Sequence, residues 1–103
     1  HNALARDLAA RVAERNDMEV LAPVTLSVVC FRYRPDGLAD EAALDALNGR
    51  IVAALNDEGQ VYIQSTRFKG RLAIRACIMH FANDADDMAH LVARVAHWGA
   101  KLA

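Results

Sequence analysis

Two apolar segments of this chain lack the apolar–polar alternation of a half-exposed sheet. In RLAIRACIMHF, residues 71–81, one set of alternate positions carries Leu, Ile and Ala, and the other carries Ala, Cys, Met and Phe. TLSVVCFRYR, residues 25–34, likewise has large apolar side chains at both sets of positions. Because successive side chains of a strand point to opposite faces, both faces of the predicted sheet are apolar. Each face therefore needs a cover, which restricts the possible folds.

The spacing of apolar residues and the positions of turn-forming residues divide the 103 residues into seven elements. Apolar residues every three or four positions predict helices, and runs of β-branched and aromatic residues predict strands. Asp40 is a suitable N-cap for the second helix, Gly59 a suitable terminator, and Lys69 with Gly70 a tight hairpin turn. The predicted elements are helices over residues 3–15, 41–57 and after an N-cap at Asn83 or Asp84, and strands over 18–22, 25–34, 60–68 and 71–81.

This order predicts a single α+β domain over residues 1–103, with helices layered on a four-stranded antiparallel sheet. All three helices can lie on one face of the sheet. The other apolar face would then be bare, and because monomers rarely expose such patches, we expect another domain or subunit to cover it. The chain begins without methionine and already in helical rhythm, as a piece of a longer protein would. His1 can equally be the remnant of a purification tag.

Arg75 lies in the middle of residues 71–81, on the face expected to be bare. A buried, unpaired guanidinium is costly, so this side chain needs a partner or water. At an interface between domains an arginine can hold a carboxylate or phosphate through two parallel hydrogen bonds. The alternative is a structural salt bridge to an acidic residue across that interface. Arg75 is therefore the candidate binding residue, with both roles open.

Composition argues against several classes of partner. The net charge is −1 and both signs are interleaved along the chain, so no basic stripe indicates nucleic acid. The longest apolar run is too short to span a bilayer, and the N-terminus does not resemble a signal peptide. Cys30 and Cys77 lie within apolar strands, where a free cysteine acts as a small hydrophobic residue, and this usage favours a cytoplasmic protein.

The remaining reactive side chains form no catalytic centre in the sequence. His90 and His97 are seven residues apart with no carboxylate to complete a metal site, so a solvent-facing or interface role is favoured. His80, at the end of a strand, is a weak candidate for a catalytic base. Lys69 and Lys101 lie in a turn and near the chain end, where burial would not lower the pKa for Schiff-base chemistry.

Four motifs in order carry a family resemblance. They are the first strand, L-S-x-V-C-F-R, a helix ending in L-N-x-x-G, and T-R-x-x-G-R-x-x-x-R, within MEVLAPVTLSVVCFRYRP and LNGRIVAALNDEGQVYIQSTRFKGRLAIRACI. Together they resemble the C-terminal part of group II pyridoxal-phosphate-dependent amino-acid decarboxylases, which include the aromatic-L-amino-acid and glutamate decarboxylases. The resemblance covers nearly all of the chain.

The resemblance implies the C-terminal small domain of the type I fold of pyridoxal-phosphate enzymes, with three helices on the sheet face away from a large domain. The full-length protein would be a dimeric carboxy-lyase that releases carbon dioxide and an amine from an amino acid. Pyridoxal 5′-phosphate would be bound by the large domain and not by this chain, which alone would be inactive. The small domain would close the active-site cleft, and Arg75, by position, would contact the substrate carboxylate.

Two alternatives without catalysis stay open at this point. One is a free-standing α+β module that binds a ligand or dimerises through its bare sheet face. The other is a purely structural domain with no ligand contact.

Overall fold

The computed structural model describes residues 2–24, 27–59, 61, 63–78 and 84–103. The four strands form one antiparallel sheet in the order β1-β2-β4-β3. The predicted α+β class and the predicted order of elements are confirmed. The elements are α1 (Asn2–Ala13), β1 (Met18–Val20), β2 (Val28–Tyr33), α2 (Glu41–Glu58), β3 (Gln64–Phe68), β4 (Arg71–Cys77) and α3 (Ala85–Leu102).

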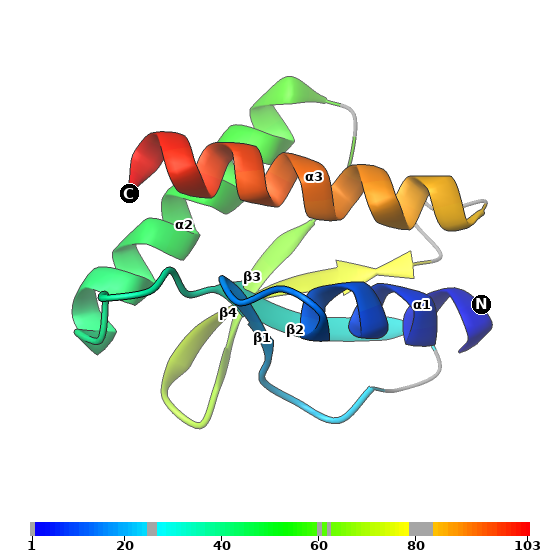
Figure 1. Ribbon diagram of the computed structural model, residues 1–103, viewed down its shortest axis with the longest axis horizontal. Helices are drawn as coiled ribbons and strands as arrows, with labels where there is room; N and C mark the ends of the chain where they lie inside the picture. The colour runs from blue at the N-terminus through cyan, green and yellow to red at the C-terminus, as the bar shows by residue number, and fades with distance from the viewer. Residues whose placement is uncertain (1, 25–26, 60, 62, 79–83) are drawn as a thin grey trace.

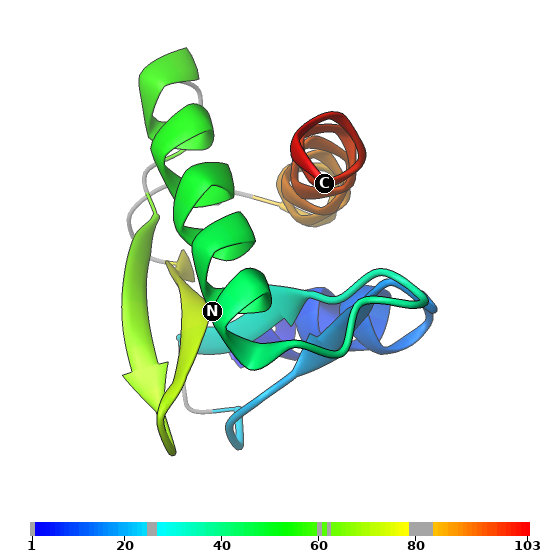
Figure 2. The same cartoon turned by 90° about the vertical axis from the view of Figure 1, so that its left-hand side faces the viewer.

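All three helices pack against the same face of the sheet, as predicted. Alternate residues of β2 and β4, such as Phe31 and Ile74, are fully buried on this face. They form one hydrophobic core with Leu8 of α1, Ile51 of α2 and Leu91 of α3. Figure 1 shows α3 lying along α1, and Figure 2 looks almost along α3 and shows it beside α2. The core therefore lies between one sheet face and a layer of helices.

The predicted caps and turns form where the sequence places them. The Asp40 side chain accepts a hydrogen bond from the first turn of α2, and Gly59 ends that helix in the left-handed region at φ 77°. Asp84 caps α3 in a reciprocal capping box. Lys69 and Gly70 both have positive φ, 51° and 81°. A two-residue hairpin turn of type I′ requires positive φ at both of its central residues.

The sheet divides beyond the paired residues Phe31 and Ile74, and α2 fills the gap. From Arg32 onward β2 is no longer paired with β4. The fully buried Asn48 of α2 accepts a hydrogen bond from Tyr33 N (2.8 Å) and donates one to Tyr33 O (2.9 Å). Asp45 of α2 accepts one from Leu72 N of β4 (2.9 Å). A helix thus supplies the polar contacts that a neighbouring strand would otherwise make.

Several predicted boundaries of helices and strands were wrong. The third strand, predicted over residues 60–68, begins at Gln64, because Asn56 of α2 bonds both the N–H and the C=O of Ile63 (3.0 and 2.8 Å). Residues 60 and 62 lie outside the described residues. The first strand ends at Val20 and the first helix at Ala13, each two residues early. The predicted parts of strands at residues 25–26 and 79–81 lie outside the described residues.

Candidate functional site

Arg75 lies at the centre of the sheet, on the face that carries no helix. Its neighbours in register are Cys30 of β2 and Gln64 of β3. Because residues that pair across antiparallel strands point to the same side, these three side chains form a row across the sheet. We call this side the open face; its half-buried residues are Val28, Cys30, Thr66, Phe68, Arg75 and Cys77. The predicted bare side of the sheet is thus confirmed within the described residues, Met79 and Phe81 lying outside them.

The Arg75 guanidinium is held by a neutral group. Its Nη1 donates a hydrogen bond to Gln64 Oε1 at 3.1 Å. Among the described residues no carboxylate lies within ion-pair distance of Arg75. Seven other arginines do have such a partner: Arg11, Arg15, Arg32, Arg34, Arg67, Arg71 and Arg94. Arg75 therefore differs from most arginines of the chain in keeping its charge uncompensated by the described residues.

The neighbour on the other side of Arg75 is neutral as well. Cys30 is a free, half-buried cysteine, and burial raises the pKa of its thiol above the ordinary value of 9.0, with the charge of Arg75 opposing that shift. The thiol is therefore protonated near neutral pH. Cys77, on the same face, is also free, as predicted. The row thus contains one positive charge between two uncharged side chains.

The other predicted candidates do not join this row. His97 packs edge-on against Trp98 on α3, and the described residues contain no group of three potential metal ligands. Lys69 lies over the Phe68 ring and Lys101 over the Trp98 ring. His80 lies outside the described residues. Nor does any helix in the described part of the chain combine the length and apolarity that crossing a membrane would require.

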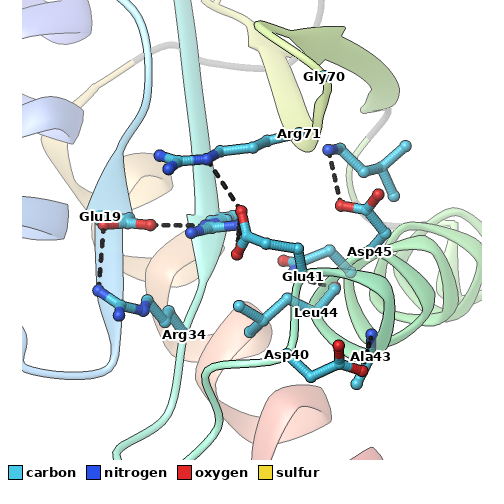
Figure 3. Close-up of polar contacts among 12 residues, drawn as sticks. Glu19, Arg34, Asp40, Glu41, Ala43, Leu44, Asp45, Gly70 and Arg71 are labelled. Carbon is cyan, nitrogen blue, oxygen red and sulfur yellow. Dashed lines mark hydrogen bonds and ion pairs between the residues drawn. The ribbon is translucent and has the colours of Figure 1, made fainter.

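A second arginine, which the sequence did not single out, is the buried one. Arg32 of β2 is only 2% exposed. Its Nε donates to Glu19 Oε1 at 2.6 Å and its Nη1 lies 3.2 Å from Glu41 Oε2. Figure 3 shows Glu41 also paired with Arg71, and Glu19 with Arg34. The pattern of residues 25–34 carries no signal for this burial, because the acidic partners come from β1 and the start of α2.

These ion pairs connect α2 to the strands at one end of the open face. Glu41 at the first turn of α2 joins the buried Arg32 of β2 to Arg71 at the start of β4. Asp45, one turn further along α2, pairs with Arg67 of β3 at 3.0 Å and accepts a hydrogen bond from Leu72 N of β4. Charge at this end of the sheet is thus compensated internally, in contrast to the row centred on Arg75.

The arrangement as a whole defines a small α+β domain with one covered and one open sheet face. No family model matches the chain. Among curated relatives, it is 26% identical over 92 residues to the aromatic-L-amino-acid decarboxylase of Bacillus atrophaeus, covering 89% of this chain and 19% of that protein. It is 33% identical over 79 residues to tyrosine decarboxylase 2 of Arabidopsis thaliana, covering 76% of this chain and 14% of that protein.

Solved structures show the same fold. The tryptophan decarboxylase of Catharanthus roseus in complex with L-tryptophan matches 99% of this chain with a TM-score of 0.84 at 22% identity, over 21% of its own length. The Oryza sativa TDC with PLP and tryptamine matches 97% with a TM-score of 0.82 at 23% identity, over 22% of its length. The predicted resemblance to group II pyridoxal-phosphate-dependent decarboxylases is confirmed. The chain spans about a fifth or less of the curated relatives it matches.

Proposed function

We propose that the chain is the C-terminal small domain of a pyridoxal-phosphate-dependent L-amino-acid decarboxylase, a carboxy-lyase that releases carbon dioxide and an amine. The observation that carries this proposal is the similarity to a decarboxylase over 89% of this chain but only 19% of the relative. The fold shared with decarboxylase structures over nearly the whole chain supports it. A dimeric assembly and a cytoplasmic location belong to the same proposal.

The open face is the surface that would contact the large domain. Apolar and half-buried side chains such as Val28, Cys30 and Phe68 lie there without a helix above them. Covering them would remove apolar surface from water, which stabilises the contact. The length of the relatives outside the matched region supplies enough chain for a large domain. In this arrangement the small domain would close one side of the active-site cleft.

The cofactor would be held by the large domain. When bound, pyridoxal phosphate supplies the electron sink for loss of the carboxylate as carbon dioxide. Both lysines of this chain are exposed and lie over aromatic rings, Lys69 over Phe68 and Lys101 over Trp98, which supports a cofactor lysine elsewhere in the protein.

Arg75 is the residue of this chain that would contact the amino-acid substrate. It is central in the open face, and the contact that the structure describes for its guanidinium is to a neutral amide. A guanidinium has five N–H donors in a planar fork, so further donors can bind a carboxylate. Contact with the substrate carboxylate would fix the orientation of the substrate in the cleft.

The test is an Arg75→Gln substitution in the full-length protein. Loss of a hydrogen bond to a charged group is expected to lower kcat/KM for the preferred L-amino acid by about 10- to 100-fold. Arg50→Gln is the matched control, because Arg50 is exposed on α2 and its described hydrogen bond is a long one, 3.4 Å, to Leu102 O. We expect the control to stay within about twofold of wild type.

If Arg75→Gln retains wild-type kcat/KM, the substrate contact is wrong and Arg75 is a structural residue of the interface. Failure of the full-length protein to release an amine from any L-amino acid when pyridoxal phosphate is supplied would contradict the decarboxylase proposal itself.

A further inference from the structure

We propose that Gln64 is a positioning residue: it holds the Arg75 guanidinium in place without neutralising it and so leaves its charge for a substrate carboxylate. This inference rests on the proposed function, because it assumes that Arg75 binds an anion. The two residues are paired in register across β3 and β4, and Gln64 Oε1 accepts a hydrogen bond from Arg75 Nη1 at 3.1 Å.

The same strand provides an internal comparison. Arg71 and Arg75 are four residues apart on β4, so their side chains leave the same face of the sheet. Arg71 is held by a carboxylate, with its Nε 2.9 Å from Glu41 Oε1. Arg75 is held by an amide that has a similar length and acceptor oxygen but no charge. The charge of Arg71 is thus compensated by a carboxylate, whereas the partner that the described residues give Arg75 is neutral.

The backbone that carries Gln64 is itself fixed. Asn56 of α2 bonds both the N–H and the C=O of Ile63, the residue immediately before Gln64. The start of β3 therefore has a defined position relative to α2, although β3 is an edge strand. On the other side of Arg75, Cys30 adds no negative charge near neutral pH. The guanidinium is held between a fixed amide and a neutral thiol.

The decisive variant is Gln64→Glu, which keeps the side-chain length and converts the amide into a carboxylate. The new carboxylate would compete with the substrate for Arg75. In the full-length protein we expect KM for the preferred L-amino acid to rise by about fivefold, the factor that corresponds to roughly 1 kcal/mol for a partly exposed ion pair. We expect kcat to change by less than KM, because the reacting groups are untouched.

The matched control is Ser65→Glu. Ser65 is the next residue of β3, exposed, and in register with Ile74, so its side chain leaves the opposite face of the sheet. This variant adds the same charge to the same strand without facing Arg75, and its KM should stay within about twofold of wild type. Gln64→Leu, which removes the acceptor without adding charge, should raise KM by a smaller factor than Gln64→Glu.

A readout independent of activity is the coupling between positions 64 and 75 in urea unfolding. Gln64→Glu should stabilise the protein when Arg75 is present and lose that effect in the Arg75→Gln background. A raised KM in Arg75→Gln together with an unchanged KM in Gln64→Glu would overturn the role of Gln64 and leave the proposed function intact. An unchanged KM in both variants would instead reject the substrate contact of Arg75. Equal effects of Gln64→Glu and Ser65→Glu would also overturn the inference.

Discussion

Replacement of Asn48 by alanine is expected to destabilise the protein more than any comparable substitution of a polar residue on α2. Asn48 is fully buried, and its amide bonds Tyr33 N, Tyr33 O and Leu44 O at 2.8, 2.9 and 2.9 Å. In the variant the N–H and the C=O of Tyr33 would lose this partner inside the core. Each such group costs about 1–3 kcal/mol. Alanine is a better helix former by about 0.5 kcal/mol, so the net loss should be about 2–5 kcal/mol.

Asn56→Ala is the control for this prediction. Asn56 lies on the same helix and makes the same pair of hydrogen bonds, to Ile63, but it is exposed. Water can replace its amide, so we expect a loss of about 1 kcal/mol or less. The free energy of unfolding can be measured by urea titration with the fluorescence of Trp98, the single tryptophan. Equal losses for the two variants, or a loss below about 1 kcal/mol for Asn48→Ala, would refute the argument from burial.

Two further predictions concern α3 and the pH dependence of stability. A Cβ added at Gly99 would lie 2.6 Å from ring atoms of the buried Tyr33, so Gly99→Ala should destabilise by about 1–3 kcal/mol, whereas Gly49→Ala, whose nearest contact is 3.6 Å away, should stabilise by up to about 1 kcal/mol. Thermal unfolding of both variants checks this, and a stabilised Gly99→Ala would contradict it. The hydrogen bond from Leu72 N, with the nearby Arg67, lowers the pKa of Asp45 below its ordinary 3.8, so its charge stabilises the fold above that pH and the effect is lost as pH falls below it. The stability difference between wild type and Asp45→Asn, measured by urea titration, should therefore shrink on acidification from about pH 6 to about pH 2, and a constant difference would contradict this.

Local signals in the sequence were sufficient to predict that the three helices and the hairpin turn exist. Asp40, Gly59 and the Lys69–Gly70 turn act through their own backbone geometry or an adjacent N–H, so they can be recognised without the tertiary structure. The apolar spacing of residues 41–57 predicts that Leu44, Leu47, Ile51 and Leu55 are buried, and all four are among the buried residues of α2. The same spacing in the last predicted helix predicts that Trp98 and Leu102 are buried, but both are half-buried at the C-terminal end of α3.

Strand boundaries depended on partners that apolar patterns do not specify. Ile63 fits the pattern of a strand, yet its backbone bonds the side chain of Asn56 and not a neighbouring strand. Tyr33 similarly turns to Asn48 at the end of β2. In both cases a polar side chain on a helix replaces a strand. For the contact between Asn48 and Tyr33 the sequence did contain a signal, because Asn48 is a polar residue among the regularly spaced apolar residues 44–55.

The candidate site could be predicted in part. Alternation along residues 71–81 placed Arg75 on the face without helices, as the structure does. Its neighbours Cys30 and Gln64 follow only from the register between strands, which alternation does not define. The burial of Arg32 depends on Glu19 and Glu41, which lie 13 and 9 residues away in the sequence. Long-range ion pairs of this kind leave no local pattern.

The two asparagines of α2 also bear on how the domain can move. Asn48 and Asn56 lie eight residues apart, about 12 Å along the helix axis. Each bonds both the N–H and the C=O of one residue outside the helix, Tyr33 and Ile63 respectively. A slide or rotation of α2 by a single residue would break all of these contacts at once. We therefore expect little internal hinge bending between α2 and the strands, so that any opening or closing would carry the domain as one rigid piece.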